Sequence, residues 1–376
     1  MQYPEEELID ILRKTGVNFT ASLPCEKIKG LLTMIGEKFF HVPLTREEEG
    51  VGICAGATLA GKKPAMFVQS SGVGNMINAL LSLTGFYELP LAVFVSRRGI
   101  YKEKIEAQLP MGKRLPGILD GAGLRHTVIS SRDDFSLIKE RLTDAYGKKE
   151  IHFFLLSPAL WEESCVTGSL LSEQCPIATT VRPRPEGELI PRLTRYGIIR
   201  LIAPYLDSRV VVCNLGFPSK ELFSVKHQPS NFYMLGSMGM VTPIGLGLSL
   251  STDKEVIVID GDGSLLMNPG TLATAAHSAP ANLTILAIDN SAYGSTGSQP
   301  TLTGSCVDLE LVARGFGIKN TVKVATEAEI IAAIKARHAG LRFIHALALP
   351  GNESVPNIPF HHLELKRQFQ EFLGKA

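Results

Sequence analysis

The stretch that decides the fold is Ile259-Asp260-Gly261-Asp262-Gly263-Ser264. It follows directly on an apolar run that begins at Val256 and has the length and β-branched composition of a buried strand. The two glycines let the backbone turn sharply and approach a phosphate group closely, while Asp262 offers a hard oxygen ligand to a metal ion. The stretch therefore predicts a ligand-binding turn at the carboxyl end of a strand in an α/β sheet.

A second polar element follows the next predicted strand, which covers residues 283–288. It is Asp289-Asn290, and Asn290 lies 28 positions after Asp262. Because parallel strands end at the same edge of a sheet, we expect a carboxylate and a carboxamide side by side there. Mg²⁺ takes few protein ligands and keeps the rest of its octahedral shell for phosphate oxygens and water. Asp262 and Asn290 are therefore candidate ligands of a Mg²⁺ ion that bridges two phosphates.

A calcium-binding loop is the nearest alternative, because Asp260, Asp262 and Ser264 have the right alternation. It fails at the sixth position, where Leu265 stands in place of the required glycine, and at the twelfth, where Thr271 replaces glutamate. A plain glycine-rich turn explains the tripeptide alone. The second polar element at its spacing makes the phosphate-bound Mg²⁺ site the favoured interpretation.

Outward from this motif, the chain alternates strand-like apolar runs with amphipathic segments, which predicts mostly parallel sheets flanked by helices. The predicted strands are 18–22, 65–69, 91–95, 126–129, 151–156, 210–213, 256–259, 283–288 and 343–347. The predicted helices are 5–15, 26–35, 46–59, 72–83, 134–146, 196–205, 270–278 and 327–337. The tail 361–373 is helical by pattern, with an edge or interface role. The fold class is α/β, in two domains of similar size.

Between the two halves, the composition shifts towards Ser, Thr, Glu and Pro. Within this stretch, Arg182-Pro183-Arg184-Pro185 can continue neither a helix nor a central strand. We therefore expect one domain at 1–165, a linker at 166–191 and a second domain at 192–376.

The first half has its own glycine-rich stretch, Ser71-Gly72-Val73-Gly74-Asn75, directly after the predicted strand 65–69. It offers backbone amides at a strand's carboxyl end, where α/β sheets bind their ligands. A nucleotide-binding Rossmann protein would be another explanation. The glycines at 236 and 239 in the second half lack the G-x-G-x-x-G spacing that such a protein requires, so this alternative is disfavoured.

Composition excludes several classes of protein. The 376 residues include 38 Lys+Arg and 37 Asp+Glu, and a formal net charge of +1 gives no long-range field for a nucleic acid. The N-terminus is acidic and amphipathic, unlike a signal peptide, and Gly, Ser and Pro interrupt the charge-poor stretch 228–252, so no membrane segment is expected. The cysteines form no C-x-x-C pair, which predicts free thiols in the cytoplasm. They are Cys25, Cys54, Cys165, Cys175, Cys213 and Cys306.

The two polar elements of the second half together resemble the signature of thiamine-diphosphate-dependent enzymes, a GDG motif followed by NN. The sequence departs from the signature at Asp289, which replaces the first asparagine, a position that does not bind the metal in the family. The resemblance implies thiamine diphosphate and Mg²⁺ as cofactors. The implied metal ligands are Asp262, the Asn290 side chain and the Ala292 carbonyl, and the implied diphosphate contacts are Gly263 and Ser264.

The same resemblance implies a catalytic glutamate. In the related decarboxylase and acetolactate synthase families, a glutamate that hydrogen-bonds N1′ of the aminopyrimidine lies nine residues before a glycine, and counting back from Gly56 gives Glu47. Such a carboxyl group must lie in a water-poor pocket. Its neighbours Glu48 and Glu49 are expected to form a solvated helix face. Gly74 and Asn75 belong to a loop that resembles the glycine loop of the pyrimidine-binding (PYR) domain.

A further element, Leu235-Gly236-Ser237-Met238-Gly239-Met240, precedes the diphosphate motif. In the family, a bulky apolar residue of this element lies between the two thiamine rings and holds them in a V. By this resemblance that residue is Met238, and the Gly236 carbonyl accepts a hydrogen bond from the 4′-amino group. Taken alone, a methionine in such a segment would be ordinary core packing.

A PYR domain followed by a diphosphate-binding (PP) domain, without a middle domain, resembles the short sulfopyruvate and phosphonopyruvate decarboxylases. The segments 23–29, 96–99 and 104–112 are most similar to the sulfopyruvate decarboxylases of coenzyme M biosynthesis, whose two domains are often separate subunits. The resemblance implies a fused chain that converts 3-sulfopyruvate to sulfoacetaldehyde and CO₂ without oxidation. Phosphonopyruvate decarboxylase is the second interpretation, and an acetolactate-synthase-like enzyme is the third, disfavoured by the missing middle domain. A regulatory protein that binds thiamine diphosphate without turnover would not need Glu47.

The substrate implied is a small 2-oxo acid with a second anionic group, so cationic side chains are its candidate ligands. No residue is assigned as proton donor, and His41, His126 and His277 are interpreted as structural or surface histidines. The family arrangement implies a homodimer or homotetramer with active sites between protomers, and neither a nucleic acid nor a membrane as partner. The candidate substrate ligands are Lys29, Arg46, Arg97, Arg98 and Lys104.

Overall fold

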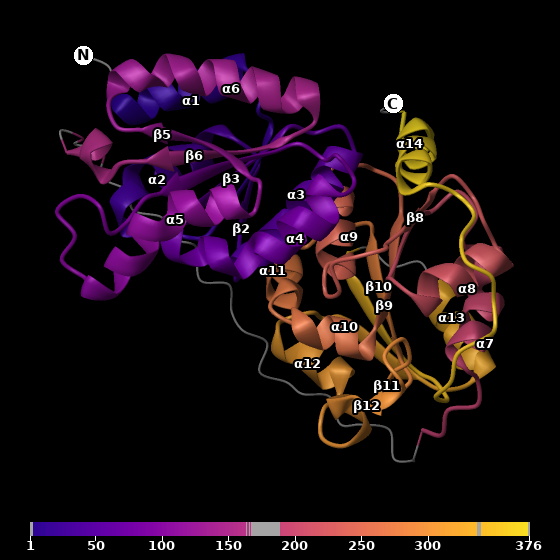
Figure 1. Cartoon of the computed structure of the whole chain (residues 1–376). Helices are drawn as coiled ribbons and strands as arrows, with labels where there is room; N and C mark the ends of the chain where they lie inside the picture. The colour runs from indigo at the N-terminus through magenta and orange to yellow at the C-terminus, as the bar shows by residue number, and fades with distance from the viewer. Residues whose placement is uncertain (1–2, 163, 165, 167–188, 337–339, 375–376) are drawn as a thin grey trace. The chain divides into compact units, whose positions relative to one another are not determined.

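The structure is a computed structural model that describes residues 3–162, 164, 166, 189–336 and 340–374. Its contacts divide the chain into two compact units, Met1–Glu173 and Gln174–Ala376. Each unit is built around a six-stranded parallel sheet with helices on both faces, which confirms the predicted α/β fold class. The predicted linker 166–191 lies almost wholly outside the described residues, so its extent stays a prediction (Figure 1).

The sheet of the first unit has the strand order β2-β1-β3-β4-β6-β5, with every neighbouring pair parallel. Its central strands are buried on both faces and consist of continuous apolar runs, as strands of such sheets do. The prediction missed only the short edge strand β2. The strands are β1 (Phe19–Ser22), β2 (His41–Pro43), β3 (Pro64–Gln69), β4 (Leu91–Ser96), β5 (Arg125–Ile129) and β6 (Ile151–Leu156).

Helices cover both faces of this sheet. On one face, α1, α2 and α6 pack their apolar side chains against Phe67, Phe94 and Phe154, whose rings stack across three neighbouring strands. On the other face, α3 packs against Met66, a contact so close that a Cβ on Gly50 would lie 2.7 Å from the Met66 Cε. The helices are α1 (Pro4–Lys14), α2 (Lys29–Lys38), α3 (Glu47–Leu59), α4 (Ile77–Ala79), α5 (Leu109–Gly121) and α6 (Phe135–Lys148).

The segment after β3 differs from the single helix predicted over 72–83. It starts as a 3-10 helix, Ser70–Met76, passes through the short α4 and ends in a π-helical turn, Leu80–Gly85. Two glycines and two serines near its start lower the α-helical propensity, which accounts for the irregular winding. The backbone after β3 is therefore wound tightly where the glycine loop was predicted.

The sheet of the second unit has the strand order β13-β14-β10-β9-β7-β8, and all of its pairs are parallel. A separate antiparallel pair, β11 with β12, forms a hairpin just after β10. The prediction missed β8, β13 and the hairpin, which are short or half-exposed. The strands are β7 (Val210–Cys213), β8 (Asn231–Tyr233), β9 (Val256–Gly261), β10 (Leu283–Asp289), β11 (Ala292–Tyr293), β12 (Gln299–Pro300), β13 (Asn320–Val324) and β14 (Arg342–Leu347).

One face of the second sheet packs against α7, α8, α13 and α14 through a single apolar cluster. On the opposite face α9 is buried along its length, and a Cβ on Gly245 would lie 2.0 Å from the Val258 Cγ2 of β9. The helices are α7 (Arg195–Ile202), α8 (Phe217–Val225), α9 (Val241–Ser249), α10 (Asp262–Met267), α11 (Thr271–Ser278), α12 (Leu309–Gly315), α13 (Glu327–Lys335) and α14 (His362–Phe372).

The C-terminal helix was predicted to have only an edge or interface role, and this prediction is wrong. Leu365 of α14 belongs to the core cluster of the second unit, and Phe369 is fully buried against the ring of Phe232. The helix has a polar surface and a narrow apolar stripe. Its burial follows from that stripe, which the overall polarity of the tail conceals.

A buried ion pair joins the first two helices of the second unit to the chain after β14. The Arg195 guanidinium donates two hydrogen bonds of 2.8 Å to the carboxylate of Glu221, which is completely buried. Arg195 also donates to Asn352, at 2.9 Å, and the Asn352 amide donates to the Gly294 carbonyl, at 2.8 Å. The ion pair thus supports the segment that follows β11.

Among the described residues, Cys25, Cys54 and Cys213 are buried free thiols and Cys306 is an exposed one. Cys165 and Cys175 lie outside the described residues. No helix in the described part of the chain is both long enough and apolar enough to cross a membrane.

We predict that Arg195→Leu lowers the free energy of unfolding of the second unit by about 3–5 kcal/mol, because it leaves the buried Glu221 carboxylate without its counter-charge. Arg367→Leu is the matched control, since Arg367 forms an exposed pair with Glu371, and its loss should cost less than about 1 kcal/mol. The measurement is the urea dependence of amide hydrogen exchange in β7 and β9. Equal losses in the two variants would contradict this account of the buried pair.

Candidate active site

The polar residues of the second unit gather where β9 and β10 end. These strands pair in parallel with Ile288 opposite Gly261, so the residues that follow, Asp289 and Asp262, emerge next to each other. Both side chains are 3% exposed. The strand register therefore brings two aspartates together at this sheet edge, and Asn290, the predicted neighbour of Asp262, is the next residue along the chain.

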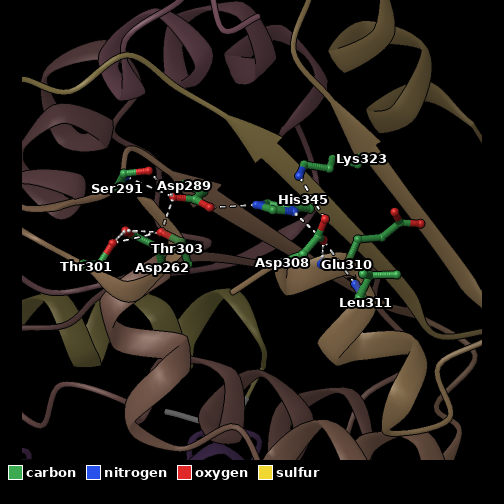
Figure 2. A network of polar contacts seen from close by, with 10 residues as sticks. All are labelled: Asp262, Asp289, Ser291, Thr301, Thr303, Asp308, Glu310, Leu311, Lys323 and His345. Atoms are coloured by element: carbon green, nitrogen blue, oxygen red, sulfur yellow. Dashed lines mark hydrogen bonds and ion pairs between the residues drawn. The ribbon is translucent and has the colours of Figure 1, made fainter. Parts of the chain in front are cut away.

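Asp262 is the first residue of α10, and its carboxylate is held by hydroxyl groups. The Thr301 hydroxyl donates to Oδ2 of Asp262, and the Thr303 hydroxyl lies 3.2 Å from the same oxygen (Figure 2). Burial raises the pKa of Asp262, and the nearby Asp289 carboxylate raises it further. Within the described residues no cationic side chain forms an ion pair with Asp262. The site thus contains a buried carboxylate that lacks a counter-charge.

Asp289 is surrounded by hydrogen-bond donors. His345 Nε2 lies 2.8 Å from its Oδ2, while the Thr303 hydroxyl at 2.8 Å and the Ser291 amide at 3.0 Å donate to Oδ1 (Figure 2). Burial alone would raise the pKa of Asp289, but the hydrogen bonds from His345 and Thr303 outweigh it and lower that pKa. The substitution of aspartate for the family's asparagine is thus matched by a set of donors around it.

His345 lies in the middle of β14 and is 1% exposed. Its Nδ1 lies 3.7 Å from Oδ1 of Asp308, whose Oδ2 accepts a hydrogen bond of 3.1 Å from Lys323 on β13. Burial lowers the pKa of His345, but its contacts with Asp289 and Asp308 outweigh burial and raise it. Acidic and basic side chains therefore alternate along the line Asp289, His345, Asp308 and Lys323 (Figure 2).

The predicted metal ligands Asn290 and Ala292 follow directly on Asp289. Asn290 is buried, and its carboxamide nitrogen has no hydrogen-bond partner among the described residues. The Ala292 carbonyl accepts from the Gly294 amide at 3.1 Å, which leaves one of its two lone pairs available. Between them, Ser291 has a φ of 54°, a left-handed conformation that non-glycine residues adopt mainly where the surrounding structure imposes it.

These residues fit a hard divalent cation. Among the described residues no three or more His, Cys, Asp or Glu side chains are grouped to hold a metal ion, so a cation here would rely on mixed oxygens. A carboxylate without counter-charge, a carboxamide and a backbone carbonyl are the oxygen donors that Mg²⁺ accepts, with phosphate and water completing its shell. The unpartnered Asn290 nitrogen is also a donor that a phosphate oxygen could accept from.

The predicted diphosphate residues Gly263 and Ser264 lie in the first turn of α10. A Cβ on Gly263 would lie 2.2 Å from Cε1 of Tyr293, so glycine is required there by the tyrosine ring as well as by any phosphate. The fully buried Ser264 hydroxyl accepts from the Gly239 amide at 3.2 Å. Ser264 thus ties α10 to the segment that contains Gly236 and Met238.

In that segment Gly236 and Met238 are both half-buried. Ser237, between them, has a φ of 59°, and Gly239 has a φ of 91°. A non-glycine residue in the left-handed region is strained, and such strain gathers at ligand sites. The bend presents the predicted ring-contacting Met238 on a tight turn and leaves it only partly covered.

Asp260, the first acidic residue of the motif, has a structural environment. It is buried, accepts from the Thr242 hydroxyl at 2.7 Å and accepts from the Gly261 amide at 2.8 Å. Burial raises its pKa to about 6. These contacts join the end of β9 to α9, beneath the first turn of α10.

In the first unit, Glu47 is the first residue of α3 and is buried. Its Oε2 accepts a hydrogen bond of 3.1 Å from the side-chain amide of Asn75. A Cβ on Gly72 would lie 1.8 Å from the Oε1 of Glu47. The predicted catalytic glutamate and the predicted glycine loop are therefore in direct contact, and only glycine fits at position 72. Gly74, by contrast, has open space around its α-carbon.

The expectation that Glu49 is a solvated residue is wrong, while Glu48 is half-buried. Glu49 is 0% exposed, and its Oε1 accepts from the Thr45 hydroxyl at 2.8 Å and from the Arg46 amide at 3.3 Å. The residue completes a capping box at the start of α3. Three glutamates in a row suggested a charged surface, but the helix start turns two of them inward.

The five candidate substrate ligands lie in the loops and helix starts that follow β1, β2 and β4, and three of them are exposed. Arg98 is buried, and its guanidinium makes hydrogen bonds of 2.6 and 2.7 Å to the carboxylate of Glu103, so its charge is balanced inside its own unit. Arg97 is half-buried, and its Nε donates to the Gly112 carbonyl at 3.1 Å. Burial lowers the pKa of Arg97. The exposed candidates are Lys29, Arg46 and Lys104.

The histidines left without a catalytic role differ in their surroundings. Both ring nitrogens of His41 contact hydroxyls of β1, Thr20 at 3.1 Å and Ser22 at 3.2 Å, and burial lowers its pKa to about 4. His126 Nδ1 lies 3.6 Å from Asp120, and His277 is exposed at the end of α11. His41 is therefore a structural histidine, as expected.

Sequence reasoning missed His345, Thr301, Thr303 and Asp308. The available signals were a histidine inside the apolar run 342–347 and an aspartate at the position where the family has asparagine. A buried acid needs donors, but nothing local indicates that they come from a strand 56 positions away and from a loop.

Comparison with known proteins identifies relatives of both halves. The family described as thiamine pyrophosphate enzyme, C-terminal TPP binding domain, matches residues 217–346. The chain is 46% identical to sulfopyruvate decarboxylase of Methanosarcina acetivorans, over 98% of this chain and 97% of that protein. It is 32% identical to phosphonopyruvate decarboxylase of Streptomyces hygroscopicus, over 95% and 90% of the two chains.

Two subunits of one further relative match separate halves. The beta subunit of sulfopyruvate decarboxylase of Methanococcus maripaludis is 46% identical over 49% of this chain and 99% of its own length. The alpha subunit is 36% identical over 42% of this chain and 96% of its own length. In fold, benzoylformate decarboxylase from Polynucleobacter necessarius is similar with a TM-score of 0.70 over 94% of this chain and 100% of that one, at 14% identity.

The near-complete coverage at 46% identity and the separate matches of the two halves confirm the predicted family and the predicted fusion. The chain belongs to the sulfopyruvate decarboxylase family of thiamine-diphosphate-dependent enzymes, with both of its parts in one polypeptide.

Proposed function

We propose that the chain catalyses the non-oxidative decarboxylation of 3-sulfopyruvate to sulfoacetaldehyde and CO₂, with thiamine diphosphate and Mg²⁺, as a step of coenzyme M biosynthesis. The bond between the keto carbon and the carboxylate breaks, CO₂ leaves, and a proton takes its place to give the aldehyde. The observation that carries the proposal is the 46% identity to a sulfopyruvate decarboxylase over 98% of the chain. The cytoplasmic location stays a prediction.

The cofactor brings the reactive carbon and the electron sink that decarboxylation of a 2-oxo acid requires. The protein's part begins with Glu47, whose buried carboxyl group is proposed to hydrogen-bond N1′ of the aminopyrimidine. The Asn75 amide fixes Oε2 of that carboxyl group, at 3.1 Å. Because Gly72 has no side chain, Oε1 keeps its position, and the group is oriented before any ligand arrives.

In the second unit, Asp262, Asn290 and the Ala292 carbonyl are proposed to hold Mg²⁺, with Gly263 and Ser264 at the diphosphate. Because the Ser264 hydroxyl accepts from the Gly239 amide and donates to the Asp260 carboxylate, we assign the diphosphate contact of Ser264 to its backbone. Met238 is proposed to contact both thiamine rings, and the Gly236 carbonyl to accept from the 4′-amino group. Support comes from the left-handed turn that leaves Met238 partly covered.

The second anion of the substrate, the sulfonate, is proposed to bind Arg97. Its guanidinium is half-buried, and within the described residues no carboxylate forms an ion pair with it. The electrostatic attraction between an incoming anion and a partly desolvated cation without counter-charge is stronger than that between the anion and an exposed lysine. Arg98 is instead assigned to holding the loop 99–103 through Glu103. Lys29, Arg46 and Lys104 remain secondary candidates.

The smallest active unit is proposed to be a homodimer, with a homotetramer as the larger alternative and active sites between protomers. The proposal rests on the family arrangement stated above. Phosphonopyruvate is the second candidate substrate, favoured by the 32% identity to a phosphonopyruvate decarboxylase over 95% of the chain. It is a dianion at its phosphonate group, and the same Arg97 would meet it.

Release of CO₂ by the purified protein with thiamine diphosphate and Mg²⁺ tests the reaction, with sulfopyruvate, phosphonopyruvate and pyruvate offered in parallel. We expect sulfopyruvate to give the highest kcat/KM. Glu47→Gln should lose activity by about 10²-fold or more, because the amide cannot serve as the proposed acid–base group. Preference for phosphonopyruvate would overturn the substrate and keep the mechanism, while no release from any of the three would refute the decarboxylase proposal.

Gly72→Ala should lower kcat/KM by about 10²-fold, because the new methyl group displaces the Glu47 carboxylate by roughly an ångström or more. Gly117→Ala in α5 is the control, since its α-carbon faces open space and its φ is not positive. Steady-state kinetics and thermal unfolding are measured for both. Full activity in a folded Gly72→Ala protein would refute the proposed fixed position of Glu47.

Arg97→Gln should raise the KM for sulfopyruvate by about 10- to 100-fold, the loss of one charge-assisted contact, and leave the KM for pyruvate within a few-fold. Pyruvate carries no second anion, so the comparison isolates the sulfonate. Arg97→Lys keeps the charge and should recover part of the loss, and Lys104→Gln compares an exposed cation. An equal rise in KM for both substrates would contradict the proposal. It would mean that Arg97 binds the carboxylate that both substrates share, or that it stabilises the fold.

A further inference from the structure

A continuous line of buried hydrogen bonds runs from β14 to the first residue of α10. His345 contacts Asp289 across the pairing of β14 with β10, in which Asp289 lies opposite Leu347. Thr303 then contacts both Asp289, at 2.8 Å, and Asp262, at 3.2 Å. Figure 2 shows the two carboxylates on either side of this hydroxyl. The strand β14, which lies between β13 and β10, thus reaches Asp262 through side chains alone.

Thr301 and Thr303 come from the 3-10 turn that follows the hairpin, so their positions depend on how that turn is held. The Thr301 amide donates to the Ser291 carbonyl at 3.0 Å, and the two threonine hydroxyls lie 2.9 Å apart. Thr303 connects this turn to the sheet through its side-chain hydrogen bond of 2.8 Å to Asp289. The contact of Asp289 with Thr303 therefore helps to place the two hydroxyls that contact Oδ2 of Asp262.

The charges along the line are unequally balanced. Asp289 has His345 at 2.8 Å, and Asp308 has Lys323 at 3.1 Å. Asp262, by contrast, has hydroxyl donors and no cationic partner within the described residues. His345 therefore supplies a hydrogen-bond partner for Asp289, which stands where the thiamine-diphosphate signature has asparagine. Asp262 keeps its carboxylate available to a cation.

We propose that His345 and Asp289 are positioning residues of the divalent-metal site: His345 anchors Asp289, Asp289 fixes Thr303, and the Thr301–Thr303 pair holds the Asp262 carboxylate in one orientation. The inference rests on the proposed function, because it takes Asp262 as a metal ligand. Groups that orient the first ligands of a metal ion set its affinity without touching it. His345 touches no reacting atom.

The test is the dissociation constant of Mn²⁺, used as a spectroscopic substitute for Mg²⁺ and measured by electron paramagnetic resonance in the presence of thiamine diphosphate. His345→Leu should weaken Mn²⁺ binding by about 10- to 100-fold, the effect found when such supporting partners are removed. Thr303→Val, which keeps the shape and removes the hydroxyl, should weaken it in the same direction. Asp262→Asn should abolish it.

His152→Leu is the matched control. His152 is also a buried strand histidine with a side-chain hydrogen bond, 2.8 Å to Thr127, but it belongs to the first unit. It should lose thermal stability without a change in Mn²⁺ affinity. If His345→Leu does not fold, two other variants take its place. They are Thr303→Val and His345→Gln, which keeps a donor for Asp289.

A rescue separates positioning from general damage. An asparagine at position 289 carries no charge that needs His345, so Asp289→Asn in the His345→Leu background should recover at least half of the lost affinity on a logarithmic scale. Unchanged Mn²⁺ affinity in folded His345→Leu and Thr303→Val, with loss in Asp262→Asn, would overturn this inference alone. Failure of the unaltered protein to bind Mn²⁺ with thiamine diphosphate would instead refute the proposed metal site.

Discussion

The parallel register of β9 and β10 is the constraint on which the rest of the second unit's site depends. With Ile288 opposite Gly261, the next residues are two aspartates that leave the sheet side by side and are both buried. Two buried carboxylates repel each other and are costly to desolvate. The surrounding residues differ between the two: a histidine contacts Asp289, while the groups that contact Asp262 within the described residues are hydroxyls and a backbone amide. This imbalance is what suits the edge to the proposed Mg²⁺ site.

The first unit uses the same kind of sheet edge for a different purpose. Glu47 begins α3 after β2, and the glycine loop follows β3, so both stand at the carboxyl ends of strands. Close packing at Gly72 and one hydrogen bond from Asn75 fix the carboxyl group without a counter-charge. A carboxyl group paired with an arginine, by contrast, has its pKa lowered and is kept ionised. The buried pair of Arg98 and Glu103 illustrates this case.

Relatives of this family carry the two parts either in one chain or in two. The structure gives each part a complete sheet, its own helices on both faces and its own apolar cluster. Neither half borrows a strand from the other within the described residues. Each part of the fused chain therefore has a core of its own.

By itself the sequence determined the α/β class, most of the strands, and the positions of Asp262, Asn290 and Glu47, because strand runs and glycine turns are local patterns. Glu49 is a charged residue and the C-terminal helix is mostly polar, so the sequence did not indicate that Glu49 and the apolar stripe of the helix are buried. Both were therefore predicted wrongly. Only the tertiary structure decided that His345 meets Asp289 and that two threonines hold Asp262. Those partners lie far apart in the chain, and their contact is set by strand order and register, which no local pattern encodes.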